Sequence, residues 1–348
     1  MLEADVEVDR RDFTVRAALT VAPGERLALF GPSGAGKTTI LEMIAGLVRP
    51  RRALILLRGR VLTSTDRPVT VIPPWRRRVG LLRQDPGLFP HLPVRANLLY
   101  GRQGTDAEAA AELTELARAL GIDGLLRSMP ARLSGGQAHR VALGRLLLSH
   151  CDALLLDEPY TGLDASLRRT LTDLVVSLVA ERGVPSILVA HELAEAQAFA
   201  DRLAVLDRGR VLQTGAPGEV VLSPATRRVA ELVGYTSFVQ LPAQHSQPDG
   251  LVAAIHPDRV VAGRYPQRGP VLDGPVTSCR PAGALWEVTI LTGAVTVTGR
   301  FPEPVAEKRE FVLTAIDPPV FGADGARVAR GPVPADRDAR WIRRIGVR

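Results

Sequence analysis

The feature that most constrains the fold is an apolar run that leads into a glycine-rich loop and then into a helix-forming stretch. Arg26–Phe30 reads RLALF, the loop that follows reads GPSGAGKTT, and Ile40–Leu47 carries apolar residues at helical spacing. A short apolar run bounded by turn residues is typical of a buried strand. The order strand, loop and helix therefore predicts an α/β domain, in which helices cover a mostly parallel sheet.

The residue types in this loop favour phosphate binding. Gly31–Thr38 fits the pattern G-x-x-x-x-G-K-[ST] between a predicted strand and a predicted helix. The glycines let backbone amides face an anion, while Lys37 adds a point charge and Thr38 offers a hydroxyl to Mg²⁺. The residues expected to contact the nucleotide here are Gly31, Pro32, Ser33, Gly34, Ala35, Gly36, Lys37, Thr38 and Thr39.

A second apolar run ends in two carboxylates. Ala153–Pro159 reads ALLLDEP, and burial of this strand would place Asp157 at its carboxyl end, where it can hold Mg²⁺. Glu158 follows directly, where it can polarise an attacking water. Together with the glycine-rich loop, the run predicts an α/β P-loop NTPase.

A serine-glycine segment then narrows the family. Leu133–Gln137 reads LSGGQ and resembles the signature of ATP-binding cassette (ABC) ATPases. Ser134 and the glycine amides ahead of a helix form a second anion-binding N-terminus. Gln84, Asp164 and His191 match the family's Q-loop, D-loop and H-loop in order and approximate spacing. The resemblance covers the first two-thirds of the chain and implies an ABC cassette with a helical subdomain.

The family resemblance implies an active site shared between two copies. Two cassettes of this family enclose two ATP molecules, so a homodimer is expected and a monomer should hydrolyse ATP poorly. Outside the phosphate loop, the residues expected to contact ATP are Phe13, Gln84, Ser134, Gly135, Gly136, Gln137 and Asp164. Phe13 is expected to stack on adenine, whereas Phe30 is expected in the core.

The resemblance also assigns catalytic and metal-binding roles. The expected catalytic residues are Glu158, His191 and Lys37, with Glu158 as the catalytic carboxylate and His191 at the γ-phosphate. The expected ligands of Mg²⁺ are Thr38, Gln84 and Asp157. Two departures affect the contacts between copies. His139 stands where the family usually has glutamine, and the D-loop reads TGLD rather than SALD.

Further apolar runs alternate with helical stretches in the first two-thirds of the chain. Leu154–Leu156, Ser186–Ala190 and Leu203–Leu206 are expected strands, separated by expected helices. This alternation predicts a largely parallel sheet, with Leu2–Val8 as an edge strand. Asp106–Leu120 is rich in alanine, leucine and glutamate and is expected to form a helical insert.

The last third of the chain changes in composition. Prolines, glycines and short runs such as Trp286–Thr292 predict a smaller all-β domain, which resembles the C-terminal TOBE-like barrel of bacterial importer ATPases. We expect an ATP-binding domain over residues 1–235, a β-rich domain over 236–325 and a basic tail over 326–348. The linker between the two domains is expected at or just before Gln240–Gly250, which is polar and without periodicity.

Composition limits the setting of the protein. Two cysteines in 348 residues are too few for a disulfide framework, so a reducing cytosol is expected. There is no apolar run of about 18 residues and no leader pattern at the start, so neither a spanning helix nor export is expected. The net charge of +7 comes almost entirely from arginine, and residues 326–348 hold seven arginines against two aspartates. We attribute this charge to arginine usage and a solvated tail, and expect no nucleic-acid partner.

Importer-like features follow the cassette motifs. Asp201–Gly215 resembles the end of a bacterial importer cassette. Arg58–Leu62, Arg77–Gly80 and the segment 84–98 resemble the ATPase of the molybdate importer. The resemblance implies a peripheral subunit at the cytoplasmic face of the membrane. Its expected partners are integral-membrane permease subunits and an extracytoplasmic solute-binding protein. Molybdate is the preferred solute, and sulfate or thiosulfate, ferric iron, polyamines and sugars stay open.

Two functions of other classes also stay open. A soluble ABC ATPase acting on nucleic acid or the ribosome would be favoured by two tandem cassettes, and only one is present. A β domain that senses an anion is the second alternative. Gln267–Val276 lacks the Ser-Ala-Arg-Asn start seen in molybdate-binding barrels, so we expect no oxyanion site there.

Overall fold

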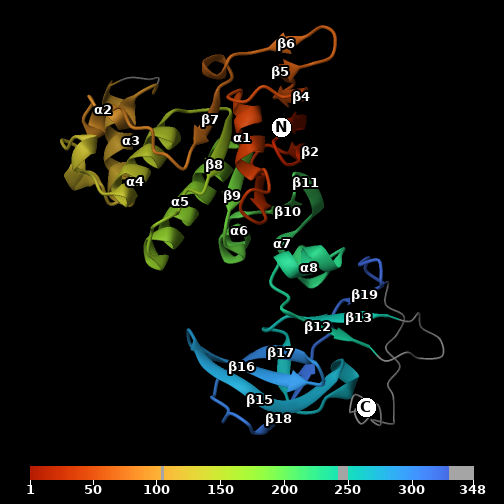
Figure 1. Ribbon diagram of the computed structural model, residues 1–348. Helices are drawn as coiled ribbons and strands as arrows, with labels where there is room; N and C mark the ends of the chain where they lie inside the picture. The colour runs from red at the N-terminus through yellow and green to blue at the C-terminus, as the bar shows by residue number, and fades with distance from the viewer. Residues whose placement is uncertain (103–105, 242–249, 329–348) are drawn as a thin grey trace. The chain divides into compact units, whose positions relative to one another are not determined.

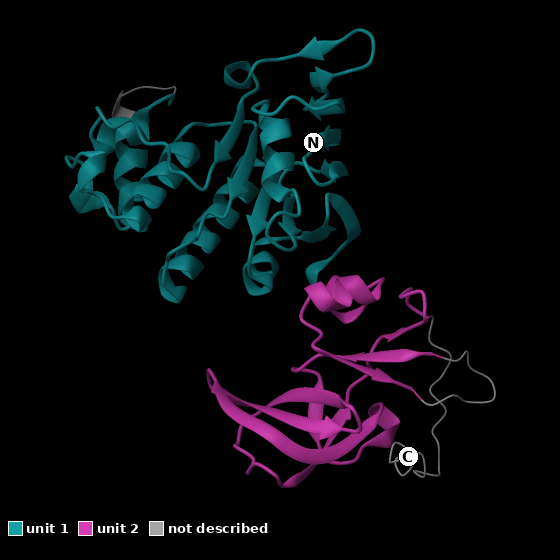
Figure 2. Ribbon diagram, viewed as in Figure 1, with its two compact units in different colours: residues 1–217 teal, residues 218–348 magenta. Residues whose placement is uncertain are grey.

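The computed structural model describes residues 1–102, 106–241 and 250–328 (Figure 1). The chain divides into two units, Met1–Pro217 and Gly218–Arg348 (Figure 2). Each unit has its own sheets and its own hydrophobic core.

The boundary between the units falls earlier than the sequence indicates. We predicted it after residue 235, whereas the units divide after Pro217. Thr226 forms an antiparallel bridge with Ala326, which ties the segment beyond the division to the β-rich part of the chain. The reason is therefore a long-range pairing that composition alone does not reveal.

Unit 1 is built on one eleven-stranded sheet, in the order β6-β5-β4-β1-β2-β11-β10-β3-β9-β8-β7. The strands are β1 Leu2–Asp9, β2 Thr14–Val21, β3 Arg26–Phe30, β4 Arg52–Leu57, β5 Arg60–Ser64, β6 Thr70–Val71, β7 Val79–Leu82, β8 Ala153–Asp157, β9 Ser186–Ala190, β10 Arg202–Asp207 and β11 Arg210–Gly215. The strands from β10 through β3, β9 and β8 to β7 are parallel. The strands from β6 through β5, β4 and β1 to β2 are antiparallel.

The two halves of this sheet bury their residues differently. All five residues of β8 and of β9 are buried, as expected for parallel strands covered on both faces. In β2 buried and exposed residues alternate, because one face of the antiparallel half meets water. The predicted largely parallel sheet is thus correct for one half only.

The first strand is interior, and our prediction of an edge strand was wrong. β1 pairs with β2 on one side and with β4 on the other. Its apolar side chains Leu2, Ala4 and Val6 are buried, while the acidic residues between them point to the opposite face. Alternation of this kind reports one solvated face and does not distinguish an edge strand from a central one.

Helices flank the sheet of unit 1 (Figure 1). Their bounds are α1 Lys37–Ala45, α2 Val94–Leu99, α3 Asp106–Ala119, α4 Gly135–Leu148, α5 Ala165–Arg182 and α6 Leu193–Phe199, with 3₁₀ turns η1 Pro74–Arg76, η2 Asp123–Leu125 and η3 Pro130–Arg132. α1 packs against β1, β2, β7, β8 and β9, and α6 packs against β3 and β9. α2, α3 and α4 pack on one another beside the sheet, which is the predicted helical subdomain. The predicted helical insert is confirmed as α3.

A buried arginine holds the C-terminal end of α1. Arg77 donates to the carbonyl oxygens of Ile44 at 2.8 Å and Met43 at 3.3 Å, in the last turn of the helix. It also donates to the Ile72 carbonyl and to Thr63 Oγ1, both at 2.8 Å. Burial lowers the pKa of this guanidinium, although it stays a cation. A cation at this position opposes the partial negative charge of a helix C-terminus.

Unit 2 contains the predicted β-rich region, with sheets in the orders β12-β13-β19 and β14-β18-β15-β16-β17. Its elements are α7 Pro217–Leu222, α8 Arg227–Leu232, β12 Ser237–Gln240, β13 Val252–Ile255, β14 Val260–Ala262, η4 Pro266–Arg268, β15 Val271–Ala282, β16 Leu285–Thr292, β17 Val295–Phe301, β18 Glu310–Ala315 and β19 Val320–Phe321. The two sheets are consistent with a barrel-like domain. Most of the predicted linker, 242–249, and most of the predicted tail, 329–348, lie outside the described residues.

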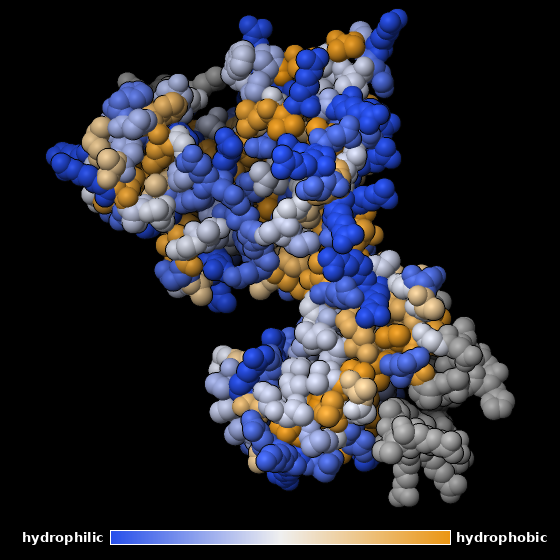
Figure 3. All heavy atoms as spheres, viewed as in Figure 1, coloured by the Kyte–Doolittle hydropathy of each residue, from blue (hydrophilic) through white to orange (hydrophobic). Residues whose placement is uncertain are grey.

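The described part of the chain contains no helix that could span a membrane. No helix there is both long enough and apolar enough to cross a bilayer. On the face drawn in Figure 3, hydrophilic side chains cover much of the surface, and apolar areas lie between them.

Candidate functional site

The glycine-rich loop between β3 and α1 is shaped by close contacts with the core. Gly31 has φ +153°, and a Cβ there would lie 2.0 Å from the Leu206 carbonyl oxygen. Gly36 has φ +101°, and a Cβ there would lie 2.8 Å from Val15 Cγ2. Both positions therefore require glycine, which explains two of the residues in the motif.

Lys37 begins α1 and folds back over this loop. Its Nζ donates to the carbonyl oxygens of Gly31 at 2.8 Å and Pro32 at 3.0 Å. Only 5% of the residue is exposed, and burial lowers the pKa of the ammonium, while Glu158 and Asp157 oppose part of that shift. The loop therefore holds a positive charge at low exposure, where an anion would be attracted strongly.

A hydroxyl and a carboxylate meet beside the lysine. Thr38 Oγ1 donates to Asp157 Oδ1 at 3.1 Å. Asp157 is buried at the end of β8, and burial raises its pKa. Gln84 lines the same pocket as Thr38. These are hard oxygen donors, and a buried carboxylate whose charge is disfavoured gains from a cation, so the set fits Mg²⁺.

Glu158 and His191 follow neighbouring parallel strands, β8 and β9. Their side chains form a short Nε2 to Oε1 contact. The Glu158 side chain is 11% exposed and that of His191 is 42% exposed, so the pair lies at the pocket wall. Glu158 has φ +53°, a conformation that non-glycine residues adopt rarely and that clusters at functional sites.

One pocket gathers most of the predicted site residues. It is lined by Arg10, Arg11, Asp12, Phe13, Ser33, Gly34, Gly36, Lys37, Thr38, Thr39, Gln84, Glu158 and His191. A second pocket, which shares Asp12, Phe13, Ser33 and Gly34 with the first, adds Pro32, Ala35, Asp207 and Arg208. Phe13 therefore lies where an aromatic ring can stack on a base, and Phe30 is buried as expected.

Sequence reasoning missed the arginine at the mouth of this pocket. Arg10 donates to Thr39 Oγ1 at 2.9 Å and lies 3.9 Å from Glu42 Oε2. Its guanidinium adds positive charge at the start of α1. In the sequence Arg10 belongs to the charged run Asp9–Asp12 directly before Phe13, and this run alone does not show that Arg10 reaches α1.

The signature residues are organised separately from this pocket. Ser134 caps α4, since its Oγ accepts the Gln137 amide at 3.2 Å and the Gln137 side chain accepts the Ser134 amide at 2.9 Å. Ser134 and Gly135 are exposed. All four signature residues, Ser134, Gly135, Gly136 and Gln137, are described, and none of them lines the nucleotide pocket. A single chain does not bring the two motifs together.

The D-loop and the unusual histidine lie close to the signature in sequence or space. Asp164 caps α5 by accepting the Leu167 amide at 2.9 Å, and it does not line the pocket. His139 is buried within α4, and burial lowers the pKa of its imidazole. Its Nε2 has no hydrogen-bond partner among the described residues. The departure at His139 therefore lies in the interior of the helix.

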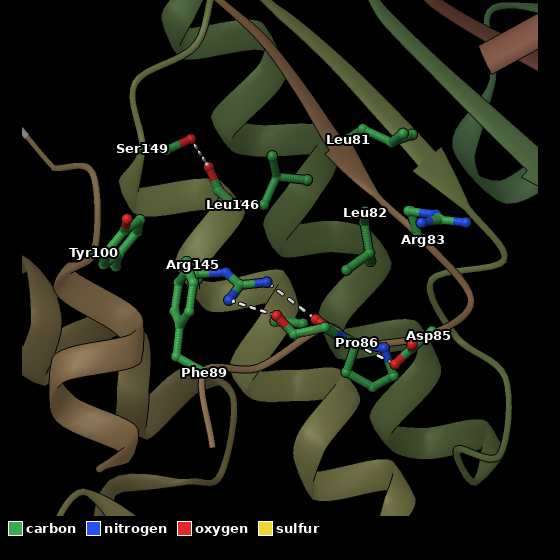
Figure 4. A pocket seen from close by; sticks show the side chains of 12 residues that line it. Leu81, Leu82, Arg83, Asp85, Pro86, Phe89, Tyr100, Arg145, Leu146 and Ser149 are labelled. Atoms are coloured by element: carbon green, nitrogen blue, oxygen red, sulfur yellow. Dashed lines mark hydrogen bonds between the residues drawn. The ribbon is translucent and has the colours of Figure 1, made fainter. Parts of the chain in front are cut away.

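A further groove lies between β7, the turn that follows it and α4 (Figure 4). Arg145 of α4 donates to the carbonyl oxygens of Pro86 and Gly87, both at 3.0 Å. The guanidinium carbon lies 5.3 Å from the ring centre of Phe89, which lies 4.2 Å from that of Tyr100. This arginine connects the turn after Gln84 to the helix that the signature begins.

Known proteins resemble the chain over its cassette. Residues 15–161 match the family described as ABC transporter. The chain is 43% identical over 231 residues to the Fe(3+) ions import ATP-binding protein of Pseudomonas fluorescens, covering 66% of this chain and 64% of that protein. It is 44% identical over 212 residues to the molybdenum import ATP-binding protein of Mesorhizobium japonicum, covering 61% and 56%. The chain thus matches less than two-thirds of the length of these relatives.

Solved structures agree with the fold of the first unit. An ATP-binding subunit of an ABC transporter superposes with a TM-score of 0.56 at 29% identity, covering 67% of this chain and 95% of that one. A dimeric ATP-binding cassette bound to ADP and phosphate has a TM-score of 0.54 at 24% identity, covering 62% and 99%. The first unit of the chain therefore has the fold of an ABC ATPase cassette, and over residues 15–161 it is similar to the ABC transporter family.

Proposed function

We propose that this protein is the ATP-hydrolysing subunit of an ABC importer. The observation that carries the proposal is the single pocket that holds Lys37, Thr38, Glu158 and His191 around a glycine loop. A cation, an acid–base pair and free helix amides in one pocket suit the binding and hydrolysis of a phosphate chain. Phe13 at the edge of the same pocket supports a nucleoside triphosphate as the substrate.

The catalytic step uses the two residues that follow β8 and β9. The Glu158 carboxylate accepts a proton from the attacking water, and the water oxygen bonds to the γ-phosphorus as the bond to the leaving oxygen of ADP breaks. His191 lies against Glu158 and can donate to an oxygen of the γ-phosphate, which orients the transferred group. Lys37 stabilises the charge on the same oxygens.

Thr38, Asp157 and Gln84 are the residues that would hold Mg²⁺. The contact between Thr38 and the buried Asp157 carboxylate supports this assignment for the first two. When bound, the ion neutralises charge on the β- and γ-phosphates. Asp157 is held by its strand, so this chain supplies the ligand geometry without ordering a loop.

A second copy of the chain would complete each site. Ser134 and Gly135 are exposed at the start of α4, and the amides of a helix N-terminus favour an anion. We infer that they face the nucleotide held by the partner's phosphate loop, with Asp164 close to the same boundary. Their separation from the pocket of their own chain supports a homodimer.

The partners and the solute follow from the relatives. Similar proteins are named for import of Fe(3+), molybdenum and, at 42% identity over 231 residues in Chromobacterium violaceum, sulfate/thiosulfate. These similar identities support a small inorganic ion and favour no single one, so molybdate stays a prediction from the segment 84–98. We place the protein at the cytoplasmic face of the membrane, with permease subunits contacting the Arg145 groove and a solute-binding protein outside.

Uptake by cells that lack the protein tests this function. Cells receive the wild type, Glu158→Gln or the control Glu181→Gln, which alters an exposed carboxylate of α5. We expect wild type and control, but not Glu158→Gln, to restore uptake of labelled molybdate, ferric iron or sulfate. Uptake that is equal with Glu158→Gln would overturn the proposed motor. A response to none of the three ions, with ATP hydrolysis intact in the purified protein, would reject only the solute class.

A further inference from the structure

Two charged residues support the turn that carries His191 from outside the nucleotide pocket. Arg168 lies on α5, and its Nη1 contacts Glu192 Oε2 at 2.6 Å, directly beside His191 in the chain. The Nη2 of the same guanidinium donates to the Leu163 carbonyl at 3.5 Å. Arg168 thus connects the segment that precedes α5 with the turn between β9 and α6.

Glu195 contacts the same turn from the first turn of α6. Its half-buried carboxylate lies near the backbone N–H of His191, which favours the ionised form of the carboxyl. Burial raises the pKa of this carboxyl to about 7, and the positive charge of Arg168 acts against that shift. Glu195 interacts electrostatically with Arg168, Glu158, Glu192 and Tyr160, and it contacts the backbone of His191.

One N–H group of the Arg168 guanidinium is not used in the contacts with Glu192 and Leu163. Its Nε is buried and has no hydrogen-bond partner among the described residues. No cation in the described part of the chain forms an ion pair with Glu195 within 4.0 Å. A buried donor without a partner is costly, so its retention near a carboxylate that lacks an ion pair calls for a reason beyond packing.

We propose that Glu195 and Arg168 are positioning residues for His191, in which Glu195 fixes the histidine backbone and Arg168 holds the turn against the segment ahead of α5. This inference rests on the proposed function. The His191 side chain is 42% exposed and makes its contact with Glu158 from a turn, so its direction depends on how that turn is held. Neither Glu195 nor Arg168 lines the nucleotide pocket or touches the reacting atoms.

Steady-state hydrolysis of ATP by the full chain distinguishes a positioning role of Glu195 from a packing role. For Glu195→Ala we expect kcat to fall about tenfold and KM for ATP to stay within about twofold, because the phosphate loop is unchanged. Glu195→Gln keeps an acceptor for the His191 amide, so we expect its kcat to remain within about twofold of wild type. Glu181→Gln is the matched control on an exposed surface. Equal losses in the Ala and Gln variants would overturn the proposal.

The pH dependence of kcat provides the readout that a packing role would not change. An ionised carboxylate accepts a hydrogen bond from an N–H more strongly than a neutral acid does. Wild-type kcat should therefore rise with pH near pH 7, as Glu195 loses its proton. The step should be absent in Glu195→Gln. In Arg168→Met its midpoint should move to higher pH, because removal of the positive charge favours the neutral acid. A wild-type profile that persists unchanged in both variants would reject the proposal.

A second measurement keeps this inference separate from the proposed function. If the wild type hydrolyses ATP no faster than Glu158→Gln, the proposed function fails, and nitrogen NMR of the His191 imidazole then decides the positioning role. With the signal assigned by His191→Asn, we expect Glu195→Ala to shift it and Glu195→Gln to leave it in place. An unshifted signal in Glu195→Ala would overturn the inference. If thermal melting shows that Glu195→Ala is unfolded, Glu195→Gln and Arg168→Met supply the test.

Discussion

The phosphate loop and the signature turn both place glycines at the start of a helix, yet they are held in different ways. At α1 the N-cap is Gly36, and no side chain caps the helix. At α4 the N-cap is Ser134, which forms a complete capping box with Gln137. At the phosphate loop no side chain accepts from the helix amides, which can therefore bind a ligand, and the loop is shaped by contacts with distant core residues. At the signature turn, hydrogen bonds between Ser134 and Gln137 cap the helix locally. Damage to the first should therefore affect both chemistry and fold, and damage to the second should remain local.

Removing the phosphate-loop cation should have the largest effect. Lys37→Ala should lower ATP hydrolysis by at least about 100-fold, or roughly 3 kcal/mol, because the pocket loses the charge that faces the phosphate oxygens. Turnover and nucleotide affinity of the purified protein measure this. Lys308→Ala removes the only other lysine, which is exposed in unit 2, and should change neither. Turnover retained in Lys37→Ala would contradict the assignment of the loop.

A methyl group at Gly31 tests the claim that the loop depends on the core. Gly31→Ala should destabilise unit 1 by about 3 kcal/mol or more, because its Cβ would overlap the Leu206 carbonyl at 2.0 Å. Denaturant unfolding of the full chain measures the loss. Gly34→Ala is the matched control in the same loop, since no atom lies within 4 Å of its Cβ, and only its φ of +78° carries a cost. Equal destabilisation by the two variants would argue against the close contact.

Glu195 lies in neither of these two motifs, and its ionisation should make the stability of the protein depend on pH. Its folded-state pKa of about 7 lies above the ordinary value of 4.5, so the native state binds the extra proton between these values. Stability should therefore fall by about 1–2 kcal/mol as pH rises from 4.5 to above 7. Glu195→Gln should lack this component, so its stability relative to wild type should increase with pH. Denaturant unfolding at pH 5 and pH 8 measures the difference, and a difference that does not vary with pH would contradict it.

The smallest effect on stability is expected at the signature cap. Ser134→Ala should cost about 1 kcal/mol, because it removes one N-cap hydrogen bond. Nucleotide affinity of a single chain should not change, while hydrolysis should fall if a second copy uses this surface. Thr226→Ala is the matched control, since Thr226 caps α8 in unit 2 with a bond of 3.2 Å to the Val229 amide. Equal hydrolysis in the two variants would remove the signature from the shared site.

Those parts of the fold that are buried on both faces were the easiest to predict. β3 and β9 have the predicted bounds, because strands covered on two sides appear as unbroken apolar runs. The interior place of β1 was missed, since its alternation depends only on one solvated face.

In the candidate site, too, some residues could be predicted from the sequence and others could not. The motif residues were predicted from local spacing. Phe13, Gln84, Glu158 and His191 line one pocket, while their roles stay predictions. Arg10 and Arg168 were missed because each acts on a residue more than 20 positions away. No pattern in a single sequence reports such contacts.

Arg77 gives α1 a fixed end. Its guanidinium joins the last turn of this helix to Thr63 of β5 and to the residue that follows β6, so the helix is fastened to the antiparallel half of the sheet at the end opposite the phosphate loop. The first residues of the helix are held from the other side, because Lys37 bonds to the Gly31 carbonyl after β3 and Thr38 bonds to Asp157 of β8. A ligand on the phosphate loop therefore acts on a helix that both halves of the sheet hold.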